Sequence, residues 1–424
     1  MKSILLFGAG KSATSLIDYL TGICEEKRWV FTIADADAEA MRKKFIASPF
    51  VQPTQVNVEN ADERNALIKK ADLVISLLPP ALHILIARDC VSNQKNLLTA
   101  SYVDNEIAKL SAAVSERKLF FLCEMGLDPG IDHMSALQII HRIQDAGGII
   151  DSFLSHTGGL VAPESDDNPW HYKISWNPAN VVKAGSAGAI FKENGKIVSI
   201  GYDKIFEKTG ITEIKPMGKF AWYPNRNSLA YIPVYGLESA HSFIRTTLRH
   251  PDYCFGWKNL VKSGLTDDEL PIPASIKTIS DWSQPLLEFV DDSNKLLYEQ
   301  LGLFQKEVLP AGCTTSAKIL QSLLEKNWKM KDTDKDMILM LHEFDYRLNN
   351  RKYSLRSSLI VKGENALRTA MAKTVGLPLG IAAKLILENR MPVSGLHIPI
   401  IPEIYEPVMK ELALEGIRFQ EELN

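Results

Sequence analysis

The sequence lacks the features that mark several classes of protein. Its 48 basic and 51 acidic side chains give a formal net charge of -3, and no basic stripe is interleaved with aromatic residues. Because binding to a phosphate backbone requires an excess of positive charge, no nucleic-acid partner is expected. No apolar run approaches the roughly 20 residues of a membrane-spanning helix, and the N-terminus shows no cleavable signal pattern. We therefore expect a cytoplasmic protein without a membrane partner.

Cysteine is scarce and dispersed. None of the five cysteines stands at the spacing of a zinc site or a redox pair, so the sequence predicts no metal site and no disulfide framework. Buried reduced thiols are expected for Cys24, Cys90, Cys123, Cys254 and Cys313. With 424 residues, 46% of them apolar, the chain is long enough for at least two domains.

A glycine-rich turn lies between an apolar strand and a helical pattern near the N-terminus. The apolar run 4–7 is followed by Gly8, Gly10 and Ala13 and then by apolar residues at helical spacing. In a dinucleotide-binding fold Gly8 permits the tight turn, Gly10 lets the backbone approach the pyrophosphate, and Ala13 allows close packing of the helix. The helix N-terminus then offers its free N–H groups to the phosphates.

Strands and helices alternate through the first 125 residues. Apolar strands are predicted at 71–80, 96–102 and 118–126, with helices at 61–71 and 104–117. This alternation predicts a parallel sheet, whose ligands lie beyond the carboxyl ends of the strands. A further strand ends at Asp35 and Asp37, roughly 25 residues past the glycines, close to the position where an acid binds the adenosine ribose hydroxyls.

The segment 124–136, "EMGLDPGIDHMSA", joins a predicted strand to a predicted helix. Asp128 is either a polar contact to a substrate amine or a turn residue, since Asp before Pro-Gly is common turn chemistry. Asp132 could cap the next helix. We interpret His133 as structural rather than catalytic.

The junction occurs with three other long motifs: "TASYVDNE" (99–106), "SFLSHTGGLVAPESDDNPWHYKISW" (152–176) and "YPNRNS" (223–228). Together these motifs resemble the saccharopine reductase family, the glutamate-forming saccharopine dehydrogenases. The resemblance runs across most of the chain and is densest between residues 99 and 250. It implies an α/β fold and usually a homodimer. A Rossmann domain of residues 1–127 and 392–424 would enclose a substrate-binding and dimerisation domain, 128–391, with a mainly antiparallel sheet.

The family's reaction condenses aminoadipate semialdehyde with glutamate to an imine, which NADH or NADPH reduces to saccharopine. Saccharopine has three carboxylates, and a guanidinium fork matches a carboxylate in two hydrogen bonds. Asp128 is the residue that the resemblance implies as catalytic, through contact with the substrate amine. The implied substrate-binding residues are Ser101, Tyr102, Asp128, Arg226, Thr247, Leu248 and Arg249.

The resemblance also implies a set of cofactor contacts. They are Gly8, Ala9, Gly10, Lys11, Ser12, Ala13, Asp35, Ala36, Asn57, Val58, Ser76, Leu77, Leu78, Thr99, Ala100, Ser101, Leu127, Asp128 and Ser175. Arg245 has less support as a substrate ligand than Arg249, with which it is predicted to share a helical or turn face.

Two positions depart from the fungal relatives. Thr157 stands where those enzymes carry a cysteine before a Gly-Gly pair, so no thiol is available there. Asp35 lies where they place an arginine suited to a 2′-phosphate; an acid there repels the phosphate, which predicts a modest preference for NAD over NADP. Arg42 and Lys43 could approach a phosphate instead, but Asp37 and Glu39 neutralise the same stretch.

The second half of the chain contains strand-like runs, helical stretches and a hairpin. Helices are predicted at 250–264, 293–304 and 315–328, then a hairpin at 335–364, a helix at 366–389, and a final helix and short strand at 399–423. The hairpin edge could pair with a second subunit. By the family pattern, the last segment returns to the Rossmann domain.

Two other functions fit the same fold. An imine reductase of carboxynorspermidine or homospermidine type would handle a diamine and would require acids where saccharopine requires arginines, so Arg226 and Arg249 favour saccharopine. A non-catalytic nucleotide-binding protein is the third possibility, since a fold alone does not fix a function.

Overall fold

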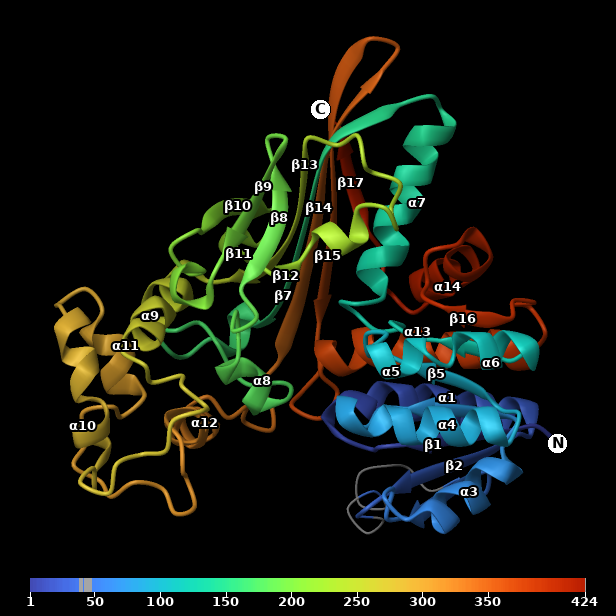
Figure 1. The fold of residues 1–424 in the computed structure, drawn as a ribbon, viewed down its shortest axis with the longest axis horizontal. Helices are drawn as coiled ribbons and strands as arrows, with labels where there is room; N and C mark the ends of the chain where they lie inside the picture. The colour runs from blue at the N-terminus through green and yellow to red at the C-terminus, as the bar shows by residue number, and fades with distance from the viewer. Residues whose placement is uncertain (38–40, 42–47, 424) are drawn as a thin grey trace. The chain divides into compact units, whose positions relative to one another are not determined.

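The computed structural model describes residues 1–37, 41 and 48–423 (Figure 1). The chain divides into two compact units. Unit 1 contains Met1–Arg142 and Leu367–Arg418, and unit 2 contains Ile143–Ala366 and Phe419–Asn424.

Unit 1 is built on a seven-stranded parallel sheet in the order β16-β6-β5-β4-β1-β2-β3. Its central strands are buried on both faces, as expected for a parallel sheet covered by helices. The fold class predicted from the alternation of strands and helices is therefore confirmed. The strands are β1 Ser3–Phe7, β2 Val30–Asp35, β3 Val51–Gln55, β4 Leu73–Ser76, β5 Asn96–Thr99, β6 Phe120–Leu122 and β16 Gly395–His397.

The helices of unit 1 come from both ends of the chain. They are the short η1 Lys11–Ala13 and η2 Pro80–Leu82, then α1 Thr14–Lys27, α3 Ala61–Lys70, α4 His83–Ser92, α5 Asn105–Ala108, α6 Ser111–Glu116, α7 Ile131–Asp145, α13 Ala370–Leu387 and α14 Pro402–Leu414. Helix α13 packs along α1, and a Cβ at Gly376 would lie 2.8 Å from the Leu16 nitrogen, so glycine permits this close approach.

Helix α13 has the length and apolar composition of a membrane span, which the sequence analysis overlooked. Within unit 1, however, 72% of its apolar window is buried. A helix that is apolar all round is also typical of a protein core. Its packing against α1 accounts for the composition.

The predicted domain boundaries, 127/128 and 391/392, differ from the two units. Unit 1 includes most of α7 and all of α13, which packs on α1. The last residues, Phe419–Asn424, belong to unit 2. Strand β16 pairs with β6, and helix α14 of the segment 399–423 also lies in unit 1. The final strand, β17 Gln420–Leu423, pairs with β15 in unit 2 instead.

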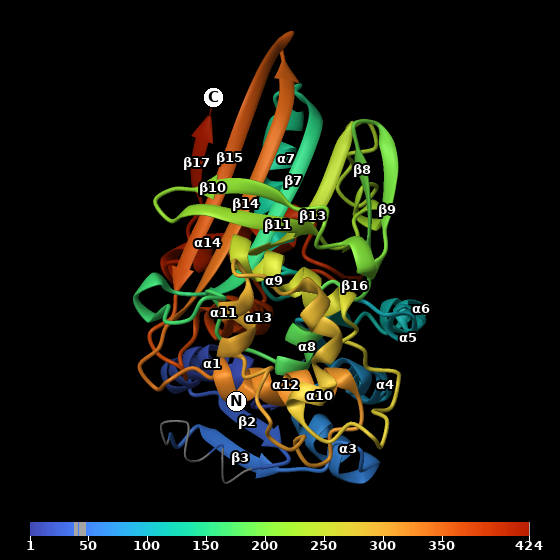
Figure 2. The same cartoon turned by 90° about the vertical axis from the view of Figure 1, so that its left-hand side faces the viewer.

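Unit 2 is organised around a mixed, mostly antiparallel sheet in the order β10-β11-β13-β7-β14-β15-β17 (Figure 2). The β13–β7 pair is parallel. Besides β17, the strands of unit 2 are β7 Ile149–Val161, β8 Ala189–Glu193, β9 Lys196–Ile200, β10 Gly210–Ile214, β11 Gly218–Pro224, β12 Arg226–Asn227, β13 Ser242–Arg249, β14 Asp336–Leu348 and β15 Arg351–Lys362.

The predicted hairpin is confirmed as β14 and β15, joined by Asn349 and Asn350 with φ of 51° and 62°. Asparagine tolerates this left-handed conformation, which two-residue hairpin turns require. The hairpin does not form a wholly free edge, because β17 pairs with Leu355–Ser358 of β15.

A second core in unit 2 lies among helices and aromatic side chains. The helices are α8 Pro178–Val182, α9 Pro251–Lys262, α10 Ile279–Trp282, α11 Lys295–Gln300 and α12 Ser316–Asn327. Trp170, Trp257 and Trp328 are fully buried there, and the Trp170 indole N–H donates to the Leu297 carbonyl at 2.7 Å.

Four cysteines are buried as predicted, whereas Cys313 is partly exposed.

Candidate active site

The glycine-rich turn has the geometry of a phosphate cradle. Gly8 has φ of +95°, and a Cβ there would lie 2.7 Å from the Leu77 carbonyl oxygen, so only glycine fits. A Cβ at Gly10 would meet nothing within 4 Å, which leaves space beside the backbone. No side chain among the described residues caps η1 or α1. The N–H groups of this helix start are therefore suited to a pyrophosphate, and the residues present fit a dinucleotide.

Asp35 ends β2 beside this turn. One oxygen of its carboxylate accepts from the Ala9 N–H at 2.7 Å, and the other accepts from the Asp37 N–H at 3.1 Å. A carboxylate has about four lone-pair sites, so capacity remains for ribose hydroxyls. The alternative phosphate ligands Arg42 and Lys43, and the neighbouring Glu39, lie outside the described residues.

A histidine that the sequence analysis missed connects the ends of β4 and β5. His83 is buried at the start of α4, and its Nδ1 lies 2.8 Å from the Ser76 hydroxyl. Its Nε2 lies 2.7 Å from the Ser101 hydroxyl. Ser76 and Ser101 are both predicted ligands, so His83 is a positioning residue for them. The sequence could have indicated His83, because it closely follows a predicted strand, and ligands of a parallel sheet lie beyond the carboxyl ends of its strands.

Burial lowers the pKa of His83 from 6.5 to about 4. The folded protein therefore holds the neutral ring, whereas the unfolded chain takes up a proton below about pH 6.5. Stability from this group is complete above that pH and is lost as the pH falls toward 4. Between pH 7.5 and 5 we expect wild type to lose about 2 kcal/mol more unfolding free energy than His83→Gln does. Urea unfolding at both pH values measures this difference; equal losses in the two proteins would contradict it.

The turn at Asn57 and Val58 is held by a buried arginine. Arg64 donates from Nη1 to the Val58 carbonyl at 2.6 Å and pairs through Nε with Asp89 at 2.5 Å.

The predicted ligands Thr99, Ala100 and Tyr102 lie at or just beyond the end of β5.

The junction 124–136 is locked by its own polar groups. The Glu124 carboxylate accepts from the Val103 N–H at 3.2 Å and lies 2.9 Å from Nε2 of His133. The Asp132 carboxylate accepts from the Gly130 N–H at 2.6 Å. These contacts agree with the structural interpretation of His133 and with a role for Asp132 at the helix start.

Asp128 differs from every residue around it. It is the one partly exposed residue between 119 and 137, where the other eighteen positions are buried. The Gly126 N–H donates to the Pro129 carbonyl, and the Ile131 N–H donates to the Gly126 carbonyl, each at 2.9 Å. The rigid turn thus presents Asp128 at the carboxyl edge of the sheet, beside Leu127, which is buried.

The other predicted substrate residues lie in unit 2. The prediction that Arg245 and Arg249 lie on a helix or turn is wrong, because both residues lie on strand β13. They still share a face, because side chains alternate along a strand. Thr247 lies on the same face, and its partner on β7 is Thr157, whose buried hydroxyl has no hydrogen-bond partner among the residues that the structure describes.

Arg249 is buried, and the described part of the chain places no counter-ion beside it. Its guanidinium lies over the rings of Tyr172 and Tyr253, at 5.1 and 5.4 Å from their centroids. Nη1 donates to the Leu248 carbonyl at 2.7 Å, but the buried Nε has no partner, and no acid of the described residues pairs with this side chain. Burial raises the pKa of Tyr223 to about 12 and that of Tyr253 well above 10, so these neighbouring phenols stay neutral.

The remaining predicted residues of unit 2 have different environments. Arg226 is exposed on the two-residue strand β12 rather than on a turn, with φ of +52°. The Leu248 side chain is in a core cluster with Leu160 and Leu339, so only its backbone is available to a ligand. Ser175 is buried, and Arg245 lies over the Tyr231 ring.

Two family models match the chain along almost its whole length. The saccharopine dehydrogenase NADP binding domain matches residues 4–122, and the saccharopine dehydrogenase C-terminal domain matches residues 126–417. The chain belongs to the saccharopine dehydrogenase family. The resemblance inferred from the motifs is thereby confirmed, and unit 1 contains the family's nicotinamide-dinucleotide-binding domain.

Individual relatives agree with this assignment. The chain is 33% identical over 451 residues to saccharopine dehydrogenase (NADP(+), L-glutamate-forming) of Schizosaccharomyces pombe, covering 100% of this chain and 99% of that protein. It is 32% identical over 447 residues to mitochondrial alpha-aminoadipic semialdehyde synthase of Bos taurus, covering 99% of this chain but 47% of that protein. The chain therefore spans about half the length of the first vertebrate relative.

A solved structure of apo saccharopine dehydrogenase (L-Glu forming) from Saccharomyces cerevisiae matches with a TM-score of 0.89 at 28% identity, over 100% of both chains. The predicted preference for NAD receives no support, because the matched domain and the Schizosaccharomyces pombe relative are both named for NADP.

Proposed function

We propose that this protein interconverts saccharopine with glutamate and 2-aminoadipate 6-semialdehyde, using a nicotinamide dinucleotide. The observation that carries the proposal is the buried Arg249, whose charge no acid of the described residues neutralises. A buried unpaired cation is costly, and a substrate carboxylate would remove that cost. A diamine substrate would instead add positive charge to this position.

Each group of residues has a distinct task in this proposal. The cofactor supplies or accepts the hydride, and the turn at Gly8 and Gly10 holds its pyrophosphate. Arg249 binds one substrate carboxylate by a two-pronged hydrogen bond, with Thr247 beside it on the same strand face. Asp128 faces the substrate nitrogen and stabilises its protonated form. His83 fixes the hydroxyls of Ser76 and Ser101.

The activity test compares two classes of substrate. Purified protein is mixed with oxidised NAD or NADP and either saccharopine or carboxynorspermidine, and formation of the reduced nicotinamide is followed by absorbance. We expect saccharopine alone to be oxidised. Oxidation of the polyamine instead would replace the substrate assignment, and no reaction with either would favour a non-catalytic nucleotide-binding protein.

We further propose that Asp35 disfavours a 2′-phosphate; the predicted preference for NAD over NADP rests on this residue. Asp35→Asn keeps an acceptor for the Ala9 N–H and removes the charge. We expect its specificity ratio, NADP over NAD, to rise about tenfold, which corresponds to ~1–2 kcal/mol for one charge contact. Steady-state kinetics with both cofactors measures the ratio, and the neighbouring Asp37→Asn serves as control. An equal change in both variants would remove Asp35 from the ribose site.

A homodimer is our proposal for the assembled protein. Part of the β15 strand beyond the residues paired with β17 offers backbone groups to a second copy. Light scattering of the purified chain tests this state, and a monomer at all concentrations would contradict it. The cytoplasmic location stays a prediction.

A further inference from the structure

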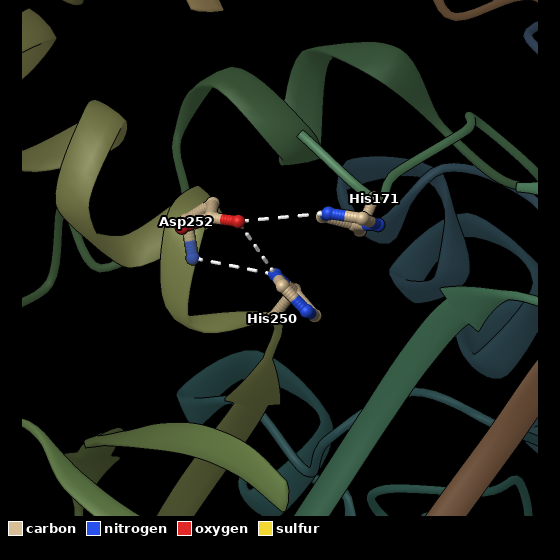
Figure 3. A group of neighbouring side chains, drawn as sticks. All are labelled: His171, His250 and Asp252. Atoms are coloured by element: carbon tan, nitrogen blue, oxygen red, sulfur yellow. Dashed lines mark hydrogen bonds and ion pairs between the residues drawn. The ribbon is translucent and has the colours of Figure 1, made fainter. Parts of the chain in front are cut away.

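Three side chains of unit 2 converge outside the predicted cofactor and substrate residues (Figure 3). His250 directly precedes α9, Asp252 lies in the first turn of α9, and His171 comes from the loop before α8. Nε2 of His171 lies 3.5 Å from the Asp252 carboxylate, and Nδ1 of His250 lies 3.3 Å from the same oxygen. One ligand atom from each residue falls within 4.8 Å of the others.

Neighbouring hydrogen bonds assign lone pairs to both ring nitrogens. Nδ1 of His171 lies 2.5 Å from the Asp166 carboxylate, which only accepts, so this nitrogen carries the proton of a neutral ring and Nε2 is left with its lone pair. Nδ1 of His250 accepts a long hydrogen bond, 3.4 Å, from the Asp252 N–H, so this nitrogen carries no proton, and a cation would take the lone pair in place of that weak bond. In Figure 3, one ring nitrogen of each histidine points toward the same carboxylate oxygen of Asp252.

Hydrogen bonds alone account poorly for this arrangement. The two ring-to-carboxylate distances, 3.3 and 3.5 Å, exceed the usual N–H···O range of about 2.7–3.2 Å. Protonating both rings would place two positive charges on imidazoles whose centroids are 3.7 Å apart. A single cation between the three groups would satisfy both nitrogens and the carboxylate together.

We propose that His171, His250 and Asp252 bind a zinc ion. Zinc bonds to nitrogen and oxygen of about 2.0–2.1 Å give tetrahedral ligand-to-ligand distances of about 3.3 Å, close to the two observed. Asp166 orients His171 in the way that carboxylates orient zinc-bound histidines. The side chains of His171, His250 and Asp252 are 34%, 32% and 53% exposed, so zinc can enter and water can complete the coordination. Cysteine spacing could not predict this site, because it contains no cysteine.

The test titrates zinc into the full-length, tag-free and metal-stripped chain by isothermal calorimetry. We expect one zinc per chain, and loss of that site in His171→Asn and in His250→Asn. Asp166→Asn, which keeps all three ligands, is expected to weaken binding about 10- to 100-fold. His241→Asn changes an exposed histidine outside the cluster and is expected to bind as wild type does.

Circular dichroism in the absence of zinc checks that each variant is folded, so that a lost site is distinguished from a lost fold. Cobalt(II) gives a second measurement, because its visible absorption reports a tetrahedral nitrogen and oxygen site in wild type. Binding that is unchanged in His171→Asn and His250→Asn, or no stoichiometric binding by wild type, would overturn the proposal. Neither result depends on the activity proposed above.

Discussion

Replacing Arg249 with lysine is expected to raise the Michaelis constant for saccharopine about a hundredfold, with little change in the constant for the cofactor. Lysine keeps a positive charge but loses the planar fork that binds a carboxylate through two hydrogen bonds. Removing one partner of a buried charge pair costs ~2–5 kcal/mol, and about 2.7 kcal/mol corresponds to a hundredfold change. Steady-state kinetics with varied saccharopine measures the effect.

Arg245→Lys is the matched control for this variant. Arg245 is buried on the same face of β13 and also lies over a tyrosine ring, Tyr231. A general disturbance of the strand would therefore raise the Michaelis constant in both variants. An unchanged constant in Arg249→Lys, or an equal rise in Arg245→Lys, would contradict the carboxylate role of Arg249.

Much of the fold follows from local patterns in the sequence. The glycines after the first apolar run, and the alternation of strands and helices up to residue 125, predict the parallel sheet of unit 1 because each element has its own hydrophobic period. The hairpin is predicted by the polar Asn349–Asn350 turn between two alternating strands. The sequence correctly predicts that Arg245 and Arg249 share a face, but it predicts a helix or turn where the structure has strand β13. Residues four apart share a face in a helix and also in a strand, so this spacing does not distinguish the two elements.

Contacts between distant segments could not be predicted in the same way. The apolar pattern of α13 marks a buried helix, but it does not identify α1 as the partner, and this partner decides the unit to which α13 belongs. The four-residue strand β17 has no buried residue, so no pattern separates it from an exposed tail. Only its pairing with β15 places it in unit 2.

Sequence motifs identify Asp128 and Arg249 in the candidate site, but the burial that distinguishes each of them is known only from the folded chain. Asp128 is partly exposed within a buried junction, in which His133 lies 2.9 Å from Glu124. Arg249 lies against the neutral rings of Tyr172 and Tyr253, and no acid among the described residues pairs with it.

Asp128→Asn is expected to lower turnover about a hundredfold while leaving the melting temperature unchanged. The amide nearly keeps the shape of the carboxylate, but it has no negative charge to face a protonated substrate nitrogen. A positioned acid or base typically contributes 10²–10⁴-fold to a rate, and we expect the lower end because bound water can also carry the proton. Stopped-flow measurement of cofactor reduction over a range of pH gives the turnover.

Asp132→Asn provides the contrast within the same turn. Its carboxylate is buried and accepts from the Gly130 N–H, so its loss is expected to lower the melting temperature. If Asp128 is catalytic, the two variants differ: Asp128→Asn loses turnover but keeps its melting temperature, whereas Asp132→Asn has a lower melting temperature. If Asp128→Asn keeps wild-type turnover across the pH range, Asp128 serves only the turn, and the proton must be handled by water or by the substrate amine itself.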